Sequence, residues 1–443
     1  MPTTALDDLV RAGDITALQE WLSATGILDI ADELSRLDPT DTAIAFRLLP
    51  RDRALAVFEA LDPRHQQQVL DGLREDRVQQ LIEEMDPDDR ARLLDELPAK
   101  VATRLLARIS PAERALTATL LGYPERSAGR IMSPEFVSLR ASMPVADAIA
   151  KIRRDGAAAE TIYTLPVLDE ERHLVGVTSL RTLVLAPPDA RVGDLMTTDV
   201  HMVSTDTDQE VAARRIQEAD LIALPVVDSE RRLVGVITVD DAMEVIEAEA
   251  TEDFALVGGH NPLNAPYLSV SALGMARARA VWLLMLIVTA ALTVNVLQVF
   301  EDTLAEVVSL ALFIPLLMGS GGNSGAQAST AVIRAMAVDE VRFADLPRIV
   351  WREARVGSLL GTMLAVAVFA PVAVIFAGDL AVTVALTLVI ICAVATTAGA
   401  ALPLFARRAG LDPAVLSAPV ITTLVDAVGL VVYFLVARAV LGL

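Results

Sequence analysis

The spacing of apolar and polar residues divides the chain into three parts. In residues 1–127, apolar side chains recur at helical intervals, as at Phe58 and Leu61, with charged residues between them. Residues 128–244 contain short β-branched runs bounded by Asp and Arg turns, a pattern typical of strands that alternate with helices. Long uninterrupted apolar runs begin only after about residue 280. We therefore predict a multidomain chain with a helical part, an α/β part and a membrane part.

The helical part repeats with a period of 24 residues. The repeat is marked by four pairs: Asp38-Pro39, Asp62-Pro63, Asp86-Pro87 and Ser110-Pro111. Each pair predicts a helix start, because the Asp or Ser side chain can accept a bond from a free backbone N–H group and proline needs no hydrogen bond in the first turn. The spacing predicts an all-α solenoid of helical hairpins over residues 1–127. On fold-level grounds alone, we expect this part to be a scaffold or a partner-binding module.

Residues 128–244 contain an internal duplication. The run Leu165-Pro166-Val167 recurs as Leu224-Pro225-Val226, and each copy predicts the order strand, helix, strand, strand, helix. These features resemble a tandem of α/β CBS domains. The resemblance implies a regulatory module whose cleft can hold a nucleotide such as ATP, with Thr238 and Asp241 at the family's ribose and phosphate positions. The first copy departs from this pattern.

Residues 277–443 contain five apolar runs that are each long enough to cross a bilayer, which needs roughly 20 apolar residues. The runs cover about 279–300, 305–333, 353–377, 380–405 and 415–441. Arginines gather in alternate loops, so the arginine side is predicted to face the cytoplasm. We expect a five-helix α transmembrane domain in the cell (inner) membrane, with the N-terminus in the cytoplasm and the C-terminus outside. The first eight residues show no pattern of a cleavable secretion signal.

The charge of the chain is as unevenly placed as its apolar residues. The formal net charge is −21, and because the ten arginines and ten carboxylates of residues 277–443 cancel, all of it lies in residues 1–276. This part should attract cations and repel nucleic acid. The only cysteine, Cys392, lies in an apolar run, so no zinc cluster or intrachain disulfide is expected. None of the four histidines accompanies a nucleophile or metal motif, so we do not expect an enzyme.

The second apolar run contains a segment rich in glycine and small polar residues. Glycine weakens a helix and frees backbone carbonyls, which a bilayer tolerates only beside protein or water. One interpretation is a pore lining, in which Gly322, Asn323 and Gly325 offer backbone and amide oxygens to a hydrated cation. The other is close helix packing, because Gly321 and Gly325 have the GxxxG spacing.

The fifth run contains a carboxylate, Asp426, at membrane depth. With a rise of about 1.5 Å per residue and a cytoplasmic boundary near residue 416, Asp426 lies about 15 Å deep in a ~30 Å core. No arginine of the runs lies at that depth, so a site for a passing cation is favoured over a structural ion pair. Magnesium is typically held by one or two carboxylates and several waters. Two copies of Asp426 across a two-fold axis would meet that need, which predicts a homodimer, and transport of Mn²⁺ or Co²⁺ is the alternative.

The link between the α/β part and the membrane part is strongly acidic. Seven carboxylates fall within fourteen residues, from Asp240 to Asp253, with no Lys or Arg among them. Like charges at helical spacing oppose a helix by a few tenths of a kcal/mol per pair, so a bound cation would stabilise this segment. The alternative is a solvated connector.

The three parts together resemble the MgtE family of magnesium channels. The motifs that carry the resemblance run from Gly321 to Gln327, from Asp412 to Gly429 and from Glu247 to Asp253. The resemblance implies Mg²⁺ transport and homeostasis, a homodimer with its pore at the interface, and an acidic plug helix in residues 245–276. It makes Asp426 the pore aspartate, with Thr422 and Thr423 beside it. It also implies that acidic residues of the cytoplasmic part bind regulatory Mg²⁺: Asp89, Asp208, Glu210, Asp220, Asp241, Glu244, Glu249, Glu252 and Asp253.

Overall fold

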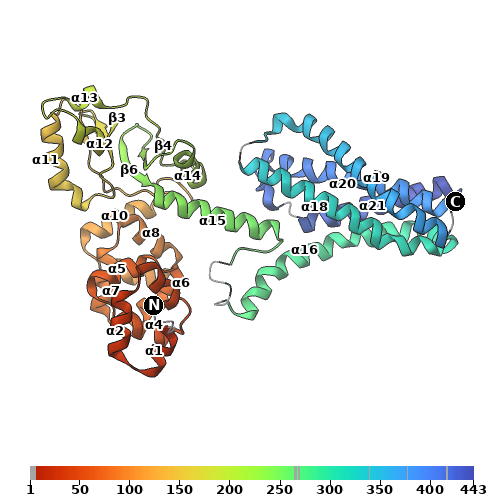
Figure 1. Cartoon of the computed structure of the whole chain (residues 1–443), viewed down its shortest axis with the longest axis horizontal. Coiled ribbons are helices and arrows are strands. Elements are labelled where there is room, and N and C mark those ends of the chain that lie inside the picture. The colour runs from red at the N-terminus through yellow and green to blue at the C-terminus, as the bar shows by residue number, and fades with distance from the viewer. Residues whose placement is uncertain (1–5, 264–266, 268–269, 339, 377, 416–417) are drawn as a thin grey trace. The chain divides into compact units, whose positions relative to one another are not determined.

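The computed structural model describes residues 6–443 except 264–266, 268–269, 339, 377 and 416–417. The chain forms two compact units, Met1–Glu249 and Ala250–Leu443. The described strands all lie in the first unit, and the described part of the second unit is helical (Figure 1). The acidic part of the sequence therefore corresponds to one unit and the apolar part to the other.

The first unit begins with ten described helices of 7 to 11 residues, coloured red to orange in Figure 1. They are α1 (Leu6–Ala12), α2 (Ile15–Ala24), α3 (Ile27–Leu34), α4 (Pro39–Arg47), α5 (Arg51–Glu59), α6 (Pro63–Gly72), α7 (Glu75–Glu84), α8 (Pro87–Glu96), α9 (Ala99–Leu106) and α10 (Pro111–Leu121). Helix α4 packs on α6, α6 on α8, and α8 on α10, as expected for stacked hairpins. One apolar core passes through the stack and includes Phe46 and Phe58, whose rings meet edge to face.

Helices α4, α6, α8 and α10 begin with the prolines of the predicted 24-residue repeat. Three of the four starts are capped as predicted, because Asp38, Asp62 and Ser110 accept bonds from first-turn N–H groups at 2.9–3.2 Å. The helix start predicted at Asp86-Pro87 is correct, but the predicted cap is wrong, because the Asp86 side chain makes no capping bond to α8. Its carboxylate lies beside two other carboxylates instead.

The α/β part contains two three-stranded sheets of the same topology, confirming the predicted strand and helix order. In each sheet the first two strands are parallel and the last two antiparallel. The strands are β1 (Leu139–Arg140), β2 (Thr164–Leu168), β3 (Leu174–Ser179), β4 (Val203–Ser204), β5 (Ala223–Val227) and β6 (Leu233–Thr238). The helices are α11 (Val145–Asp155), the 3-10 turn η1 (Gly156–Ala158), α12 (Leu180–Leu185), α13 (Val192–Leu195), α14 (Gln209–Glu218) and α15 (Val239–Val257).

The helical stack and the second sheet share an apolar core. Ala91 of α8 and Leu120 of α10 lie in the same buried cluster as Met132 and Ile237. An ion pair adds to this contact, because the Arg130 guanidinium donates to both carboxylate oxygens of Asp95. The end of α8 is therefore fixed against the α/β part.

The second unit is a bundle in which one helix is central. Helix α20 packs against α18, α19 and α21, while α16 packs mainly against α21. The helices are α16 (Ala272–Val299), α17 (Glu301–Glu306), α18 (Ile314–Ala337), α19 (Leu346–Ile375), α20 (Gly378–Arg408) and α21 (Ala418–Leu441), with the 3-10 segments η3 (Val308–Phe313), η4 (Phe343–Asp345) and η5 (Pro413–Val415). Tyr433 fixes α21 to η3, because its hydroxyl donates to the Leu310 carbonyl at 3.0 Å.

By length and composition, four helices in the described part of the chain are able to cross a membrane: Ala272–Val299, Phe343–Ile375, Gly378–Arg408 and Pro419–Leu441. They correspond to the first, third, fourth and fifth predicted runs. The second predicted run, 305–333, instead contains the end of α17, all of η3 and most of α18, so five spanning helices are not confirmed. The small polar residues of α18, such as Asn323 and Gln327, make that helix less apolar than the other four. The start of the fifth predicted run includes residues 416–417, which lie outside the described residues.

The expected boundary between the α/β part and the plug segment falls inside a helix. Helix α15 runs without interruption from Val239 to Val257, across the expected boundary at 244/245. The plug segment expected over 245–276 therefore consists of the second half of α15, a connection, and the first residues of α16. The acidic run does form a helix, in spite of its like charges.

Candidate cation sites

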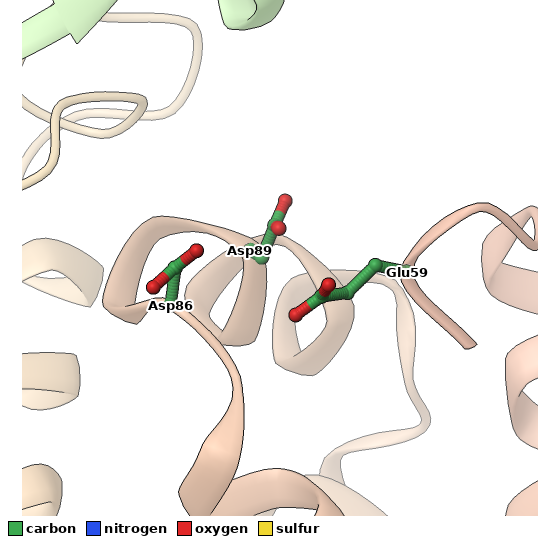
Figure 2. A group of neighbouring side chains, drawn as sticks. All are labelled: Glu59, Asp86 and Asp89. Carbon is green, nitrogen blue, oxygen red and sulfur yellow. The ribbon is translucent and has the colours of Figure 1, made fainter. Parts of the chain in front are cut away.

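Three carboxylates of the first unit form a close group. Glu59 is the last residue of α5, Asp86 directly precedes α8, and Asp89 lies in the first turn of α8. Each offers an oxygen within 4.8 Å of the other two, and Figure 2 shows the side chains gathered over the start of α8. The free N–H groups of a helix start favour negative charge. Opposite oxygens of an octahedral Mg²⁺ site lie about 4.2 Å apart, so a small inward movement or one bridging water would let this group hold the ion.

The electrostatics of this group favour a bound cation. Burial, followed by the charges of Asp89 and Asp86, raises the pKa of Glu59 to about 7. Burial also raises the pKa of Asp89, although Arg92 opposes the shift. Glu59 Oε1 is buried with no hydrogen-bond partner among the described residues. Near neutral pH the group must therefore keep a proton or gain a positive charge.

Further carboxylates approach the group from α8 and from the α/β part. Burial, then Asp86 and Asp241, raises the pKa of Glu160 to about 7. Burial raises the pKa of Asp241 to about 6, even though the Thr238 hydroxyl donates to its carboxylate at 2.5 Å. Asp88 is 7% exposed, its Oδ1 has no partner within the described residues, and burial together with Asp241 holds its pKa well above the usual range. We call these residues and the three above the carboxylate cluster: Glu59, Asp86, Asp88, Asp89, Glu160 and Asp241.

A buried arginine fixes the position of α8 beneath the carboxylate cluster. Arg90 is fully buried and donates to the carbonyls of Ile82 and Met85, at 3.1 and 3.3 Å. It also donates to the Thr117 hydroxyl at 2.8 Å and forms an ion pair with Glu113, both on α10. Arg90 thus joins α8 to α10 and also lowers the pKa of Asp86. Arg92 lowers the pKa of Glu59 and Asp89.

Of the predicted cytoplasmic ligands, Asp89 and Asp241 belong to the carboxylate cluster. Three of the others form ion pairs: Glu244 with Arg92, Glu249 with Arg126 and Glu210 with Arg214. Asp208 caps α14, and Asp220 has the left-handed backbone conformation. Glu252 and Asp253 lie on the last turns of α15. Glu249 also accepts a bond from Gln209 at 2.7 Å. No second group of three close carboxylates occurs among the residues that the structure describes.

Sequence reasoning missed four members of the carboxylate cluster. Asp86 was assigned a capping role, and Glu59, Asp88 and Glu160 were not singled out. The Asp-Pro repeat contained a signal, because Asp86 is followed by two further aspartates within three residues, which no other repeat shows. Glu160 carried no such signal, since only the tertiary fold brings it near α8.

In the second unit, three glycines of α18, Gly321, Gly322 and Gly325, lie in close helix contacts. A Cβ atom on Gly321 would overlap Ile391 of α20, and one on Gly322 would lie 3.2 Å from Thr422 of α21. The backbones of Gly325 and Gly399 approach so closely that a side chain on Gly399 would overlap the Gly325 carbonyl. Helix α18 is continuous from Ile314 to Ala337, in spite of its glycines. Small residues let the three helices approach, and this packing preserves the backbone hydrogen bonds.

The polar residues of α18 and α21 that were predicted to line a pore lie at or near the surface of this single chain. Asn323 is exposed, while Thr422, Thr423 and Asp426 are half-buried. Both threonine hydroxyls donate to the Pro419 carbonyl at 2.9 Å, which leaves their oxygen lone pairs free. In the described residues, Asp426 forms no ion pair. Its carboxylate therefore remains available to a cation.

Comparison with known proteins agrees with this architecture. A family model described as the MgtE intracellular N domain matches residues 25–126, CBS domain models match 128–189 and 192–248, and the MgtE divalent cation transporter model matches 314–436. The magnesium transporter MgtE of Thermus thermophilus is 38% identical over 440 residues, covering 99% of this chain and 98% of that protein. The magnesium transporter MgtE of Bacillus subtilis is 35% identical and covers 72% of this chain and 71% of its own.

Two solved structures resemble the first part of the chain. The cytosolic domain of the Mg²⁺ channel MgtE in complex with ATP is 37% identical, with a TM-score of 0.52, and covers 54% of this chain and 98% of that one. The soluble part of a magnesium transporter is 30% identical, with a TM-score of 0.50, and the match covers 55% of this chain and 96% of that one.

The fold and these matches define a multi-pass membrane transporter with a helical N-terminal domain and a CBS pair. The chain belongs to the MgtE family of magnesium transporters. The family consists of transporters rather than enzymes, and it supports Mg²⁺ as the transported ion over Mn²⁺ or Co²⁺.

Proposed function

We propose that this protein is a Mg²⁺ channel whose acidic cytoplasmic unit senses Mg²⁺ and closes the pore when the ion is abundant. The observation that carries the proposal is the carboxylate cluster, in which Glu59, Asp86 and Asp89 offer three oxygens within 4.8 Å of one another. Their raised pKa values mean that the cluster is short of positive charge at neutral pH. A divalent cation supplies that charge and joins α5, α8 and the start of α15.

The pore is proposed to lie between two copies of the chain. Asn323 and Asp426 lie on a surface that one chain leaves partly uncovered, and the buried glycines Gly322 and Gly325 bring α18 against α21. Two Asp426 carboxylates with Thr422 and Thr423 would hold a Mg²⁺ ion that keeps most of its water. In this arrangement α18 is the fifth spanning helix, and its polar residues face the ion path instead of lipid.

We propose an orientation in the membrane from the positions of the arginines. Arg277 and Arg279 lie near the start of α16, and Arg407 and Arg408 lie at the end of α20, whereas Glu301 and Asp302 begin α17. The side rich in arginine is proposed to face the cytoplasm, with the first unit on the same side and the C-terminus outside, in the inner membrane.

Closure is proposed to be a population shift. Without Mg²⁺ the carboxylates repel one another, and the arrangement that opens the pore is favoured. Mg²⁺ binds the compact arrangement more tightly, which is the only way in which a ligand can shift such an equilibrium. To shift the ratio of closed to open protein from 1:99 to 99:1, Mg²⁺ must bind the closed state more tightly by about 5.5 kcal/mol in total. This is little more than one kcal/mol per ion if roughly five ions bind. The further acidic residues of α14 and α15, including Glu249, Glu252 and Asp253, are proposed as the weaker sites.

A nucleotide is a second proposed ligand of the CBS pair. By the family resemblance, Thr238 and Asp241 would contact the ribose and the phosphates, and the structure of a related cytosolic domain is a complex with ATP. In this chain the Thr238 hydroxyl donates to Asp241, which also belongs to the carboxylate cluster. ATP and Mg²⁺ are therefore proposed to influence each other's binding through Asp241.

The test is tracer flux of Mg²⁺ into liposomes that contain the full chain, with Mg²⁺ varied on the side of the acidic unit. We expect Asp426→Asn to assemble normally and to lose flux, and the parent to close as Mg²⁺ rises towards millimolar. The triple variant Glu59→Gln, Asp86→Asn, Asp89→Asn should stay open at Mg²⁺ levels that close the parent. Asp71→Asn, which changes an exposed carboxylate of α6, is the control and should close like the parent. Normal flux through Asp426→Asn would refute the pore assignment, and normal closure of the triple variant would refute the sensor.

A further inference from the structure

Helix α15 ends in a fixed turn. The backbone N–H groups of Gly258, Gly259 and His260 donate to the carbonyls of Phe254, Leu256 and Ala255 at 2.9–3.1 Å. Gly259 has a φ of +70°, the left-handed conformation that commonly ends a helix and that favours glycine. The end of α15 therefore has one defined geometry, and the chain leaves it in a defined direction.

Helix α16 holds this turn through two hydrogen bonds. Trp282 Nε1 donates to Asn261 Oδ1 at 2.9 Å, and the Asn261 backbone N–H donates to the Ala278 carbonyl at 3.2 Å. Among the described residues of α16, Trp282 is the only one that is buried, with 7% of its surface exposed. The contact with the turn thus accounts for the one buried side chain among the described residues of α16.

The same turn contacts the start of α21. A Cβ atom on Gly259 would lie 2.8 Å from the Pro419 side chain, so the turn and Pro419 touch. Leu256 of α15, Trp282 of α16 and Ala414 of η5 form one buried cluster. The Pro419 carbonyl is the acceptor for both threonine hydroxyls of the proposed pore, and Asp426 follows Pro419 by seven residues, or about 10 Å of helix.

We propose that Asn261 and Trp282 are positioning residues that couple the end of α15 to the first turn of α21, so that a movement of α15 repositions Thr422 and Thr423. The inference deepens the proposed function and rests on it, because it requires a pore that the cytoplasmic unit controls. Helix α15 is suited to this task, since it contains Asp241 near one end and Leu256 near the other, about 22 Å apart along one continuous helix. Residues that favour one of two positions of such a helix can change how strongly the Mg²⁺ sites control the pore, without contacting the ions themselves.

The test uses variants that remove one atom group each. Trp282→Phe keeps an aromatic ring but loses the N–H donor, and Asn261→Ala loses the acceptor. Both should reach the parent's maximal Mg²⁺ flux at low Mg²⁺ within about twofold, and both should bind Mg²⁺ in calorimetry with the parent's affinity within about twofold. The Mg²⁺ concentration that halves the flux should rise at least threefold in each, and no further in the double variant. Asn261→Asp, which keeps the acceptor oxygen, should restore closure. Asn295→Ala, on the exposed face of α16, is the control.

The outcomes separate the inference from the proposed function. Parent-like closure in both Trp282→Phe and Asn261→Ala would overturn the coupling role and leave the sensor proposal intact. A loss of maximal flux without a shift in closure, or a loss of Mg²⁺ affinity, would also overturn it, because either result indicates a structural role. If the parent itself does not close with rising Mg²⁺, the proposed sensing function fails, whatever the variants do.

Discussion

Arg92 of α8 forms an ion pair with Glu244 of α15, and the same guanidinium lies 2.8 Å from Asp89. This arginine therefore supplies a positive charge at the edge of the carboxylate cluster. It lowers the pKa of Glu59 and of Asp89, whereas most neighbouring charges raise them. Arg92 and the buried Arg90, which lowers the pKa of Asp86, thus offset only part of the negative charge of the cluster, and Mg²⁺ would supply the rest.

Replacing this arginine should change the affinity of the cluster for Mg²⁺. In Arg92→Gln the carboxylates lose a nearby positive charge, so we expect Mg²⁺ to bind about three- to tenfold more tightly, a change of roughly 0.7–1.4 kcal/mol. Without Mg²⁺ the variant should unfold at a lower temperature than the parent, because repulsion increases. Calorimetric titration and thermal unfolding of the full chain would measure both effects. Arg36→Gln, which removes an exposed arginine that pairs with Asp32 on the N-terminal stack, should change neither.

The pH dependence of the cluster has a definite sign. The pKa values of Glu59 and Glu160 are raised to about 7 and that of Asp241 to about 6, all above their ordinary values. The folded chain therefore binds more protons than the unfolded chain between about pH 4.5 and 7, and its stability without Mg²⁺ should fall as pH rises through that range. Mg²⁺ must displace those protons, so its affinity should be at least about tenfold weaker at pH 5.5 than at pH 7.5.

Thermal unfolding of the full chain at pH 5.5 and 7.5, with and without Mg²⁺, checks this. The increase in the midpoint temperature on adding Mg²⁺ should be larger at pH 7.5. In the triple variant Glu59→Gln, Asp86→Asn, Asp89→Asn most of this difference should disappear. An equal increase at both pH values in the parent would mean that protons and Mg²⁺ do not compete for the cluster.

The glycine contacts of α18 give a matched pair of substitutions. Gly399→Ala places a methyl group against the Gly325 carbonyl, where there is no room, and should destabilise the bundle by roughly 1–3 kcal/mol. Gly319→Ala also changes a helix glycine, but its Cβ would meet nothing within 4 Å, so stability should stay the same or rise slightly. Thermal unfolding in detergent distinguishes the two. Similar behaviour of both variants would show that α18 and α20 do not approach at Gly325.

The proposed homodimer can be tested by mass. One carboxylate and one polar face of α18 per chain are too few to surround an ion, so we expect the purified protein in detergent to have the mass of two chains. A single cysteine placed at Asn323, in a chain with Cys392→Ser, should form a disulfide between chains if the two faces meet. A monomeric mass in a preparation that still transports Mg²⁺ would contradict the dimer.

The repeat and the duplication made much of the fold predictable. Local signals, such as the Asp-Pro starts of α4 and α6, depend on residues close in sequence and were confirmed. The carboxylate cluster was harder, because Asp86 looks like a helix cap in sequence and only the approach of Glu59, 27 residues earlier, shows its other use. The same oxygen serves for capping and for binding a cation, so its role depends on tertiary neighbours.

In the membrane unit, too, some residue roles could be predicted from the sequence and others depended on tertiary neighbours. Asp426 could be singled out because a carboxylate in an apolar run has few explanations. The glycines of α18 could not be assigned, because packing and pore lining require the same small residues. The structure separates the two kinds of residue by position: Gly321 and Gly325 face neighbouring helices, and Asn323 is exposed on the surface of the chain.

The sparse burial of α16 has a consequence for how the protein is made. In the most apolar 18-residue stretch of α16, 6% is buried, against 56% in that of α20. A helix whose surface is apolar on all sides is as well accommodated by lipid tails as by protein, so α16 can enter the bilayer before any later helix has been synthesised. Helix α20 cannot reach its final state in that way, because its partners α18 and α21 lie on both sides of it in the sequence. We therefore expect α16 to insert into the membrane first and without a partner helix. The core around α20 can form only after α21 has been synthesised.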